Sequence, residues 1–163
     1  MDILKISLFA STFLTGLIAG LFYSYSCSVN LGLSKLSDIE YLKAMKSINK
    51  EILNPWFFSS FIGSMIMIPF CAWLSYERAG VDASFYLLLA SSVIYIIGVF
   101  GLTGFGNVPL NGALDKFDIT LANVQEIKAK RESFEIPWNR FHFVRTIANA
   151  TAFALLLLSI IEI

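Results

Sequence analysis

The amino-acid sequence predicts an all-α protein, a bundle of four transmembrane helices with two amphipathic connecting helices on one side. Of the 163 residues, 56% are hydrophobic and only 15% are charged, whereas soluble domains carry about a quarter charged residues. The charged residues are also clustered, so that four long uncharged intervals separate them. Such a chain would expose more hydrocarbon than one small globule can hide. We therefore expect a single integral membrane domain over residues 1–163, in contact with the lipid bilayer.

Each uncharged interval is long enough for a membrane span. A helix needs about 20 apolar residues to cross about 30 Å of hydrocarbon. Proline lacks the N–H that a helix interior needs, so Pro109 should end the third helix and Pro137 should begin the fourth. The predicted spans are about 4–31, 55–76, 83–104 and 137–162.

Both long connections carry an amphipathic helical pattern. In the first, Ser37 and Glu40 have the spacing of a capping box, which predicts a helix start. Apolar residues then recur every three or four positions, as they do on one face of a helix. Each helix is expected to be a solvated connector, to lie on the membrane or to cap the bundle. The two apolar stripes are Ile39, Leu42, Met45, Ile48 and Ile52, and then Phe117, Leu121, Val124 and Ile127.

The positions of the cations predict an orientation. Ten of the twelve Lys and Arg residues lie in or beside the two long connections, and only Lys5 and Arg78 lie on the other side. The positive-inside rule then places both connections in the cytoplasm, here of a bacterial inner membrane. Twelve acidic residues cancel the twelve cations overall, so we expect no nucleic-acid partner.

Two cysteines and one histidine make a poor metal-ligand set. They are too few for a structural zinc site, and a single histidine disfavours haem and copper sites. We expect no metal and no other cofactor. Gly16 and Gly20 form a G-x-x-x-G pair, which lets helices approach closely and could serve the fold or a homo-oligomer equally well.

One face of the last helix carries polar groups at membrane depth. Trp138, His142, Arg145 and Asn149 are spaced by four, three and four residues, so they share a face that should point into the bundle. Ionisable groups at this depth are costly and mark functional sites. The structural alternative is that Arg140 and Arg145 anchor the helix end and that Trp138 belongs to the interfacial belt.

Two other segments end on the same side of the membrane. The first span brings Tyr23, Ser26 and Asn30 there at helical spacing, and Asn107 and Asn111 follow the third span. These asparagines should satisfy free backbone groups or contact the arginine of the last helix. The sequence thus predicts a one-sided pocket with an aromatic wall and convergent polar groups.

These segments resemble a family of membrane proteins that includes the fungal anthrone oxygenases. The resemblance runs along nearly the whole chain and is most specific in the run from Asn107 to Asn111, Asn-Val-Pro-Leu-Asn, with Trp138 and Val144-Arg145-Thr146 downstream. The chain departs from the family pattern at Asn30-Leu31 and at His142-Phe143.

The resemblance implies oxidation of an anthrone to an anthraquinone by O₂ without metal or flavin. His142 would then be the base and Arg145 would stabilise the resulting anion. Asn107 and Asn111 would orient the carbonyl group, and Trp138 and Tyr23 would form the aromatic wall. The alternative is a non-enzymatic membrane protein that binds a quinone or another hydrophobic ligand, or acts as an accessory subunit or small transporter.

Overall fold

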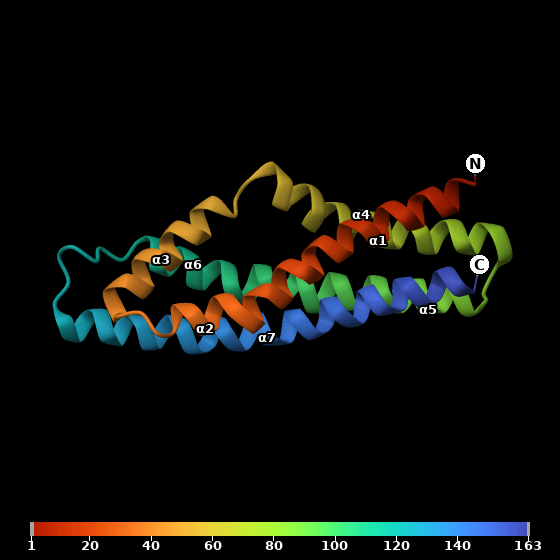
Figure 1. Ribbon diagram of the computed structural model, residues 1–163. Coiled ribbons are helices and arrows are strands. Elements are labelled where there is room, and N and C mark those ends of the chain that lie inside the picture. Colours follow the sequence, from red (N-terminus) through yellow and green to blue (C-terminus); the bar gives the residue numbers. More distant parts are fainter. Residues whose placement is uncertain (1, 163) are drawn as a thin grey trace.

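The structure, a computed structural model, describes residues 2–162 and confirms the predicted four long apolar helices. They run over Ile3–Leu33, Pro55–Ala79, Ala83–Asp115 and Val124–Ile161. Figure 1 shows the start of the first helix and the end of the last at one end of the bundle, with both long connections at the other. Each helix has the length and composition to cross a membrane, so the chain is an all-helical integral membrane protein in contact with lipid.

The first long helix consists of α1 (Ile3–Ser24), the π-helical segment η1 (Tyr25–Val29) and α2 (Asn30–Leu33). The Asp2 carboxylate accepts a hydrogen bond from the backbone N–H of Leu4, at 3.0 Å, and so caps α1. Its other oxygen lies 2.8 Å from the Arg78 guanidinium, near the end of α4 (Pro55–Ala79). This exposed ion pair joins the outer ends of the two helices.

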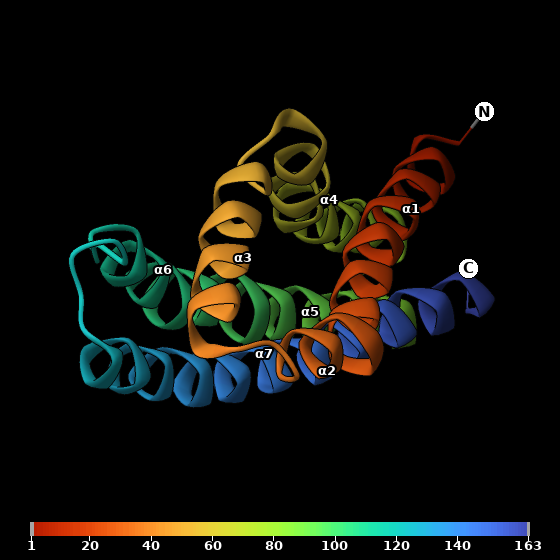
Figure 2. The same cartoon turned by 60° about the vertical axis from the view of Figure 1, so that its left-hand side comes forward.

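The first connecting helix, α3 (Asp38–Glu51), forms as predicted. Ser37 and Glu40 make both hydrogen bonds of the capping box, because each side chain satisfies a free backbone N–H of the other residue. Tyr41, Leu42 and Met45 are buried against the neighbouring helices, so α3 covers the end of the bundle. Figure 2 shows α3 starting beside α7, with its last turn and the start of α4 farther from the layer that α5, α6 and α7 form.

The third long helix continues past Pro109, so the prediction that this proline ends it is wrong. It contains α5 (Ala83–Ile94), two π-helical segments, η2 (Tyr95–Gly101) and η3 (Thr103–Asn107), and α6 (Val108–Asp115). The N–H of Val108 bonds the carbonyl of Thr103, five residues back. Pro109 therefore sits in the first turn of a new α-helical register, where a backbone N–H would lack an α-helical partner in any case.

The last helix, α7 (Val124–Ile161), also begins earlier than predicted. Asn123 and Glu126 form a second capping box at its start, and Pro137 lies in its interior. The expected separate second connecting helix therefore does not exist: its residues divide between a loop and the first turns of α7. Phe134 and Trp138, on either side of Pro137, are buried in one cluster with α3. We attribute the continuity of the helix across the proline to this packing, because an interior proline costs about 3 kcal/mol.

Arg131 ties α3 to α7. Its guanidinium lies 2.7 Å from the Glu135 carboxylate and 2.9 Å from that of Asp38. It also donates to the backbone carbonyls of Ser34 and Leu36, and it stacks over the Tyr41 ring with its central carbon 4.5 Å from the ring centroid. Burial, and after it the Glu135 carboxylate, raise the pKa of Tyr41, so this ring stays neutral beneath the cation.

Close helix contact falls on one glycine of the G-x-x-x-G pair and on glycines outside it. A Cβ atom on Gly16 would lie 3.2 Å from the Phe153 ring of α7. A Cβ atom on Gly98 would lie 2.7 Å from the Cβ of Ala148, and one on Gly106 would lie 2.6 Å from the Phe141 ring. A Cβ on Gly20 would meet no atom within 4 Å. Gly98 and Gly106 thus allow the third long helix to approach α7. Self-association through the face that carries Gly20 stays a prediction.

We predict that Gly98→Ala destabilises the bundle by about 1–3 kcal/mol, because the new methyl group forces η2 and α7 apart. The free energy of unfolding in mixed detergent micelles measures the effect. Gly20→Ala is the matched control and should change this free energy by less than about 0.5 kcal/mol. Equal effects of the two substitutions would contradict the assigned contact.

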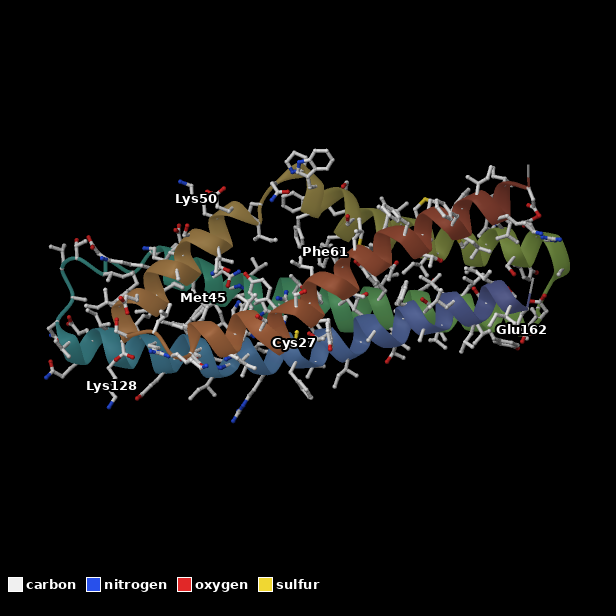
Figure 3. The ribbon with its side chains drawn as sticks, in the orientation of Figure 1. Cys27, Met45, Lys50, Phe61, Lys128 and Glu162 are labelled. Carbon is white, nitrogen blue, oxygen red and sulfur yellow. The ribbon has the colours of Figure 1, made fainter. Side chains whose placement is uncertain are left out.

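We also predict that Arg131→Ala loosens α3 while the four long helices stay folded. Each guanidinium contact that holds α3 to α7 is lost, so amide hydrogen exchange over residues 34–51 should become at least tenfold faster. Lys128→Ala removes a cation from the same part of α7 and is the control, because its side chain points away from the bundle (Figure 3). Unchanged exchange in Arg131→Ala would show that buried apolar contacts alone hold α3.

Candidate functional site

The polar face of α7 points into the bundle, as the spacing predicts. Trp138, His142, Arg145 and Asn149 are all buried, and the exposed fractions of the last three are 2%, 8% and 0%. No carboxylate of the described residues lies within ion-pair distance of Arg145. A buried cation without an anion is costly, which is why such groups favour a negatively charged ligand.

Arg145 is held by one histidine, one threonine and two aromatic rings. Its Nε and Nη2 lie 3.3 Å and 3.2 Å from Nδ1 of His142, and its Nη1 lies 3.3 Å from Oγ1 of Thr103, in η3. The central carbon of the guanidinium lies 4.3 Å from the centroid of the Phe22 ring and 5.4 Å from that of Trp138. These π faces partly replace the missing counter-charge.

His142 has both ring nitrogens engaged. A guanidinium only donates hydrogen bonds, so Nδ1 must be the acceptor and the neutral ring carries its proton on Nε2. Nε2 lies 3.1 Å from Oγ of Ser26, in η1, to which it donates in this tautomer. The ring stacks on Trp138, with centroids 5.1 Å apart and planes at 14°. His142 is therefore held by Arg145, Ser26 and Trp138.

The two asparagines of the Asn-Val-Pro-Leu-Asn segment meet Trp138. Nδ2 of Asn107 donates to the backbone carbonyl of Trp138, at 3.2 Å, and the indole N–H of Trp138 donates to Oδ1 of Asn111, at 2.9 Å. The first of these contacts joins the Asn107 side chain to the backbone of α7. Oδ1 of Asn107 has no hydrogen-bond partner, although the residue is only 1% exposed.

The structure does not place Tyr23 or Asn30 in this group. The Tyr23 side chain is 67% exposed on the outside of α1, and no side-chain hydrogen bond of Asn30 is found among the described residues. The physical reason lies in the buried face of α1, which ends with Ile18 and Phe22. Tyr23 directly follows Phe22 and so points off this face, whereas Tyr25 comes three residues after Phe22 and shares its face. Tyr25 takes the place expected for Tyr23, and it packs against both Trp138 and His142.

Asn149 is buried on the expected face but lies farther along α7, away from the cavity. Neither atom of its amide has a hydrogen-bond partner within residues 2–162. Thr103, Phe22 and Tyr25 are site residues that the sequence analysis missed. Phe22 and Tyr25 are three residues apart on the helix face that also carries Ser26, and this spacing is a signal for both. Thr103 lies at the start of η3, a segment that the amino-acid pattern does not reveal.

A cavity of about 150 Å³, the inner pocket, opens beside Arg145. Its polar lining consists of Arg145, Thr103 and three asparagines, two from the Asn-Val-Pro-Leu-Asn segment and Asn49 from α3. Apolar side chains from α3 and α4 close the opposite side. The aromatic residues that line it are Phe22, Tyr25, Phe57, Phe58, Phe61 and Trp138.

A second cavity of about 490 Å³, the vestibule, adjoins the inner pocket. The two share Asn49, Leu53, Val108 and Asn111 in their walls. Lys46, Lys50 and Asp115 line only the vestibule, which is the more polar of the two. The inner pocket is thus an apolar, aromatic cavity lined by the Arg145 cation, and the adjoining vestibule carries further charged side chains.

A larger hollow of about 610 Å³ lies between α1 and α7 near the other end of the bundle. Its walls are almost entirely apolar, with Phe9, Phe13 and Phe153 among them, and it contains no convergent polar groups. It lies on the lipid-facing side of two membrane spans, so we take it as a lipid-filled groove. Within the described residues, no three His, Cys, Asp or Glu side chains are close enough together to hold a metal ion.

Comparison with known proteins assigns the chain to a family. The family model described as anthrone oxygenase matches residues 56–155, which is more than half of the 163 residues. No curated protein matches the chain, and neither does any solved structure. The matched region contains α4 to α6 and most of α7, including Asn107, Trp138 and Arg145. The chain belongs to the anthrone oxygenase family.

Proposed function

We propose that this protein is a cofactor-independent oxygenase that converts an anthrone-like or quinol-like aromatic to a quinone in the inner pocket. The observation that carries the proposal is the guanidinium of Arg145, which lines an aromatic cavity and has no carboxylate partner among the described residues. Family membership supports the same reaction class. The positive-inside rule supports an orientation in which the vestibule opens to the cytoplasm.

The proposed reaction begins with removal of a proton from the methylene carbon that is conjugated with the substrate carbonyl. The negative charge spreads to the carbonyl oxygen, where Arg145 stabilises it in a dry, low-dielectric site. The electron-rich carbon then reacts with O₂ and, after protonation, forms a C–O–OH group. Loss of water leaves the second carbonyl group. One oxygen atom of O₂ is thus retained in the quinone, and the other leaves in water with both methylene hydrogens.

His142 is the proposed base. Tyr25 and Arg145 are the two titratable side chains that line the inner pocket, and a phenol and a guanidinium are both protonated at neutral pH. His142 contacts Arg145 directly, but that contact occupies Nδ1. Nδ1 becomes free when the substrate oxygen replaces it as the acceptor of the guanidinium hydrogen bonds. Proton transfer is therefore coupled to the engagement of Arg145 with the substrate.

The aromatic walls support a planar ligand. Tyr25, Phe57 and Phe58 contribute aromatic surface to the wall of the cavity. Trp138 lines the same cavity, although His142 and Phe134 already stack on its ring. The indole N–H of Trp138 is already bonded to Asn111, so this ring has a defined orientation. A quinone product fits the same surfaces, and binding without oxidation is the outcome that would favour a non-enzymatic role.

We predict that Arg145→Lys lowers kcat for anthrone oxidation by about 10²–10³-fold, because it removes preorganised donors to the developing oxyanion. The assay follows O₂ consumption and anthraquinone absorbance above the spontaneous rate. Arg140→Lys, an exposed arginine on the same helix, is the control and should behave like the wild type. Anthraquinone should bind Arg145→Lys with nearly unchanged Kd, since it carries no anionic oxygen. If the wild type bound anthraquinone but did not oxidise anthrone, the proposed activity would be wrong.

The role of His142 is tested by a pair of variants. His142→Ala and His142→Gln should both lose about 10²-fold or more in kcat, because neither can accept a proton. Glutamine can still accept the Arg145 hydrogen bond through its side-chain carbonyl, so it preserves a purely positioning contact. A His142→Gln enzyme with near wild-type kcat would show that His142 only positions Arg145 and is not the base.

A further inference from the structure

We infer that the ligand carries an anionic carboxylate, which lies in the vestibule beside Lys46 and Lys50 while its aromatic body fills the inner pocket. This inference rests on the proposed function, because it takes the inner pocket as the aromatic site. It adds a substrate class, a carboxylated polycyclic aromatic, and a second binding region with its own residues.

The two cavities form one continuous path. The walls of both include Asn49 of α3, Leu53 just after α3, and Val108 and Asn111 of α6. The inner pocket, at about 150 Å³, is below the usual size of a ligand site, whereas the adjoining vestibule has about 490 Å³. A ligand that reaches Arg145 therefore extends through the shared walls into the vestibule.

The charges of the vestibule favour an anion. Lys46 reaches across from α3, and its Nζ donates to the backbone carbonyl of Phe117 at 2.9 Å, which leaves two of its three N–H groups for a ligand. Lys50 lies on the rim, where its side chain extends away from α3 (Figure 3). Asp115 is the opposing carboxylate, and neither lysine forms an ion pair with it or with any other described acidic residue. Among the residues that line the vestibule, two cations stand against one anion, and Asp118 lies close enough to Lys46 to offset part of its charge.

Two buried amide groups along the path have no hydrogen-bond partner. Asn49 lines both cavities and its buried Nδ2 is an unpaired donor, and Asn107 lines the inner pocket and its buried Oδ1 is an unpaired acceptor. Leaving such groups unpaired costs about 1–3 kcal/mol each. A carboxylate oxygen at the junction would pair with the Asn49 donor, and a ring hydroxyl group farther in would pair with the Asn107 acceptor.

The test compares two probes of nearly equal shape, anthraquinone-2-carboxylate and anthraquinone-2-carboxamide. Their Kd values are measured by quenching of tryptophan fluorescence in phosphatidylcholine nanodiscs. The wild type should bind the carboxylate about fivefold more tightly than the carboxamide, as expected for partly exposed ion pairs. Lys50→Gln and Lys46→Gln should bring this ratio close to one, and Asp115→Asn should increase it. The exposed Lys50 side chain makes no hydrogen bond or ion pair within the described residues, so its variant should fold normally.

Lys43→Gln is the matched control, because Lys43 lies on the same helix but lines neither cavity. It should leave the ratio unchanged. If it reduced the ratio as much as Lys50→Gln does, the lysines would act only as general charge at the membrane surface, and the inference would be overturned. Equal binding of both probes by the wild type would overturn it too, while leaving the proposed function intact. Binding of neither probe would reject the aromatic pocket itself.

Discussion

The rest of this site depends on one buried guanidinium. Arg145 lies inside an apolar bundle, where a free cation is expensive, and the described chain offers it no carboxylate. Its neighbours are neutral acceptors and ring faces: His142, Thr103, Phe22 and Trp138. They orient the cation without cancelling its charge. The uncompensated positive charge of Arg145 therefore favours a ligand in the adjacent pocket that carries negative charge.

Two π-helical segments contribute side chains to this site. Tyr25 and Ser26 of η1 follow Phe22 by three and four residues and face α7, while Tyr23 of α1 lies on the outside. In η3, the wider turn directs Thr103 and Asn107 toward Arg145 and Trp138, and it permits Pro109 to follow without ending the helix. Both η1 and η3 thus depart from regular α-helical geometry at the positions that contribute side chains to the site. This placement agrees with the frequent use of π-helical turns at functional sites.

The extension of the bundle beyond the apolar spans supplies the second half of the site. Here α3 crosses over α6 and α7, and the Arg131 contacts hold its first turns in place. Residues of its last turns, Asn49 among them, then form walls of both cavities. A membrane protein with four bare spans would have no such chamber. The connecting helix therefore serves as a structural part of the binding site, in addition to its amphipathic role at the interface.

The linear pattern of charge and apolarity was enough to determine the class of the protein, the number of spans, the capping box of α3 and the inward face of α7. These features depend on local composition and on the 3.6-residue period, which any single helix carries by itself. The helix ends at Pro109 and Pro137 were predicted wrongly, since the cost of an interior proline depends on the register before it and on the packing around it.

The members of the site were decided only by the tertiary structure. The cavity is lined by Tyr25 and not by the predicted Tyr23 or Asn30. It is also lined by Asn49, which lies on a helix that the sequence predicts only as a connector or cap. A one-residue change of helical register rotates every later side chain, and no pattern of residue types marks where that change occurs. The sequence could indicate that Arg145 needs partners, but the choice among them follows from packing between helices far apart in the chain.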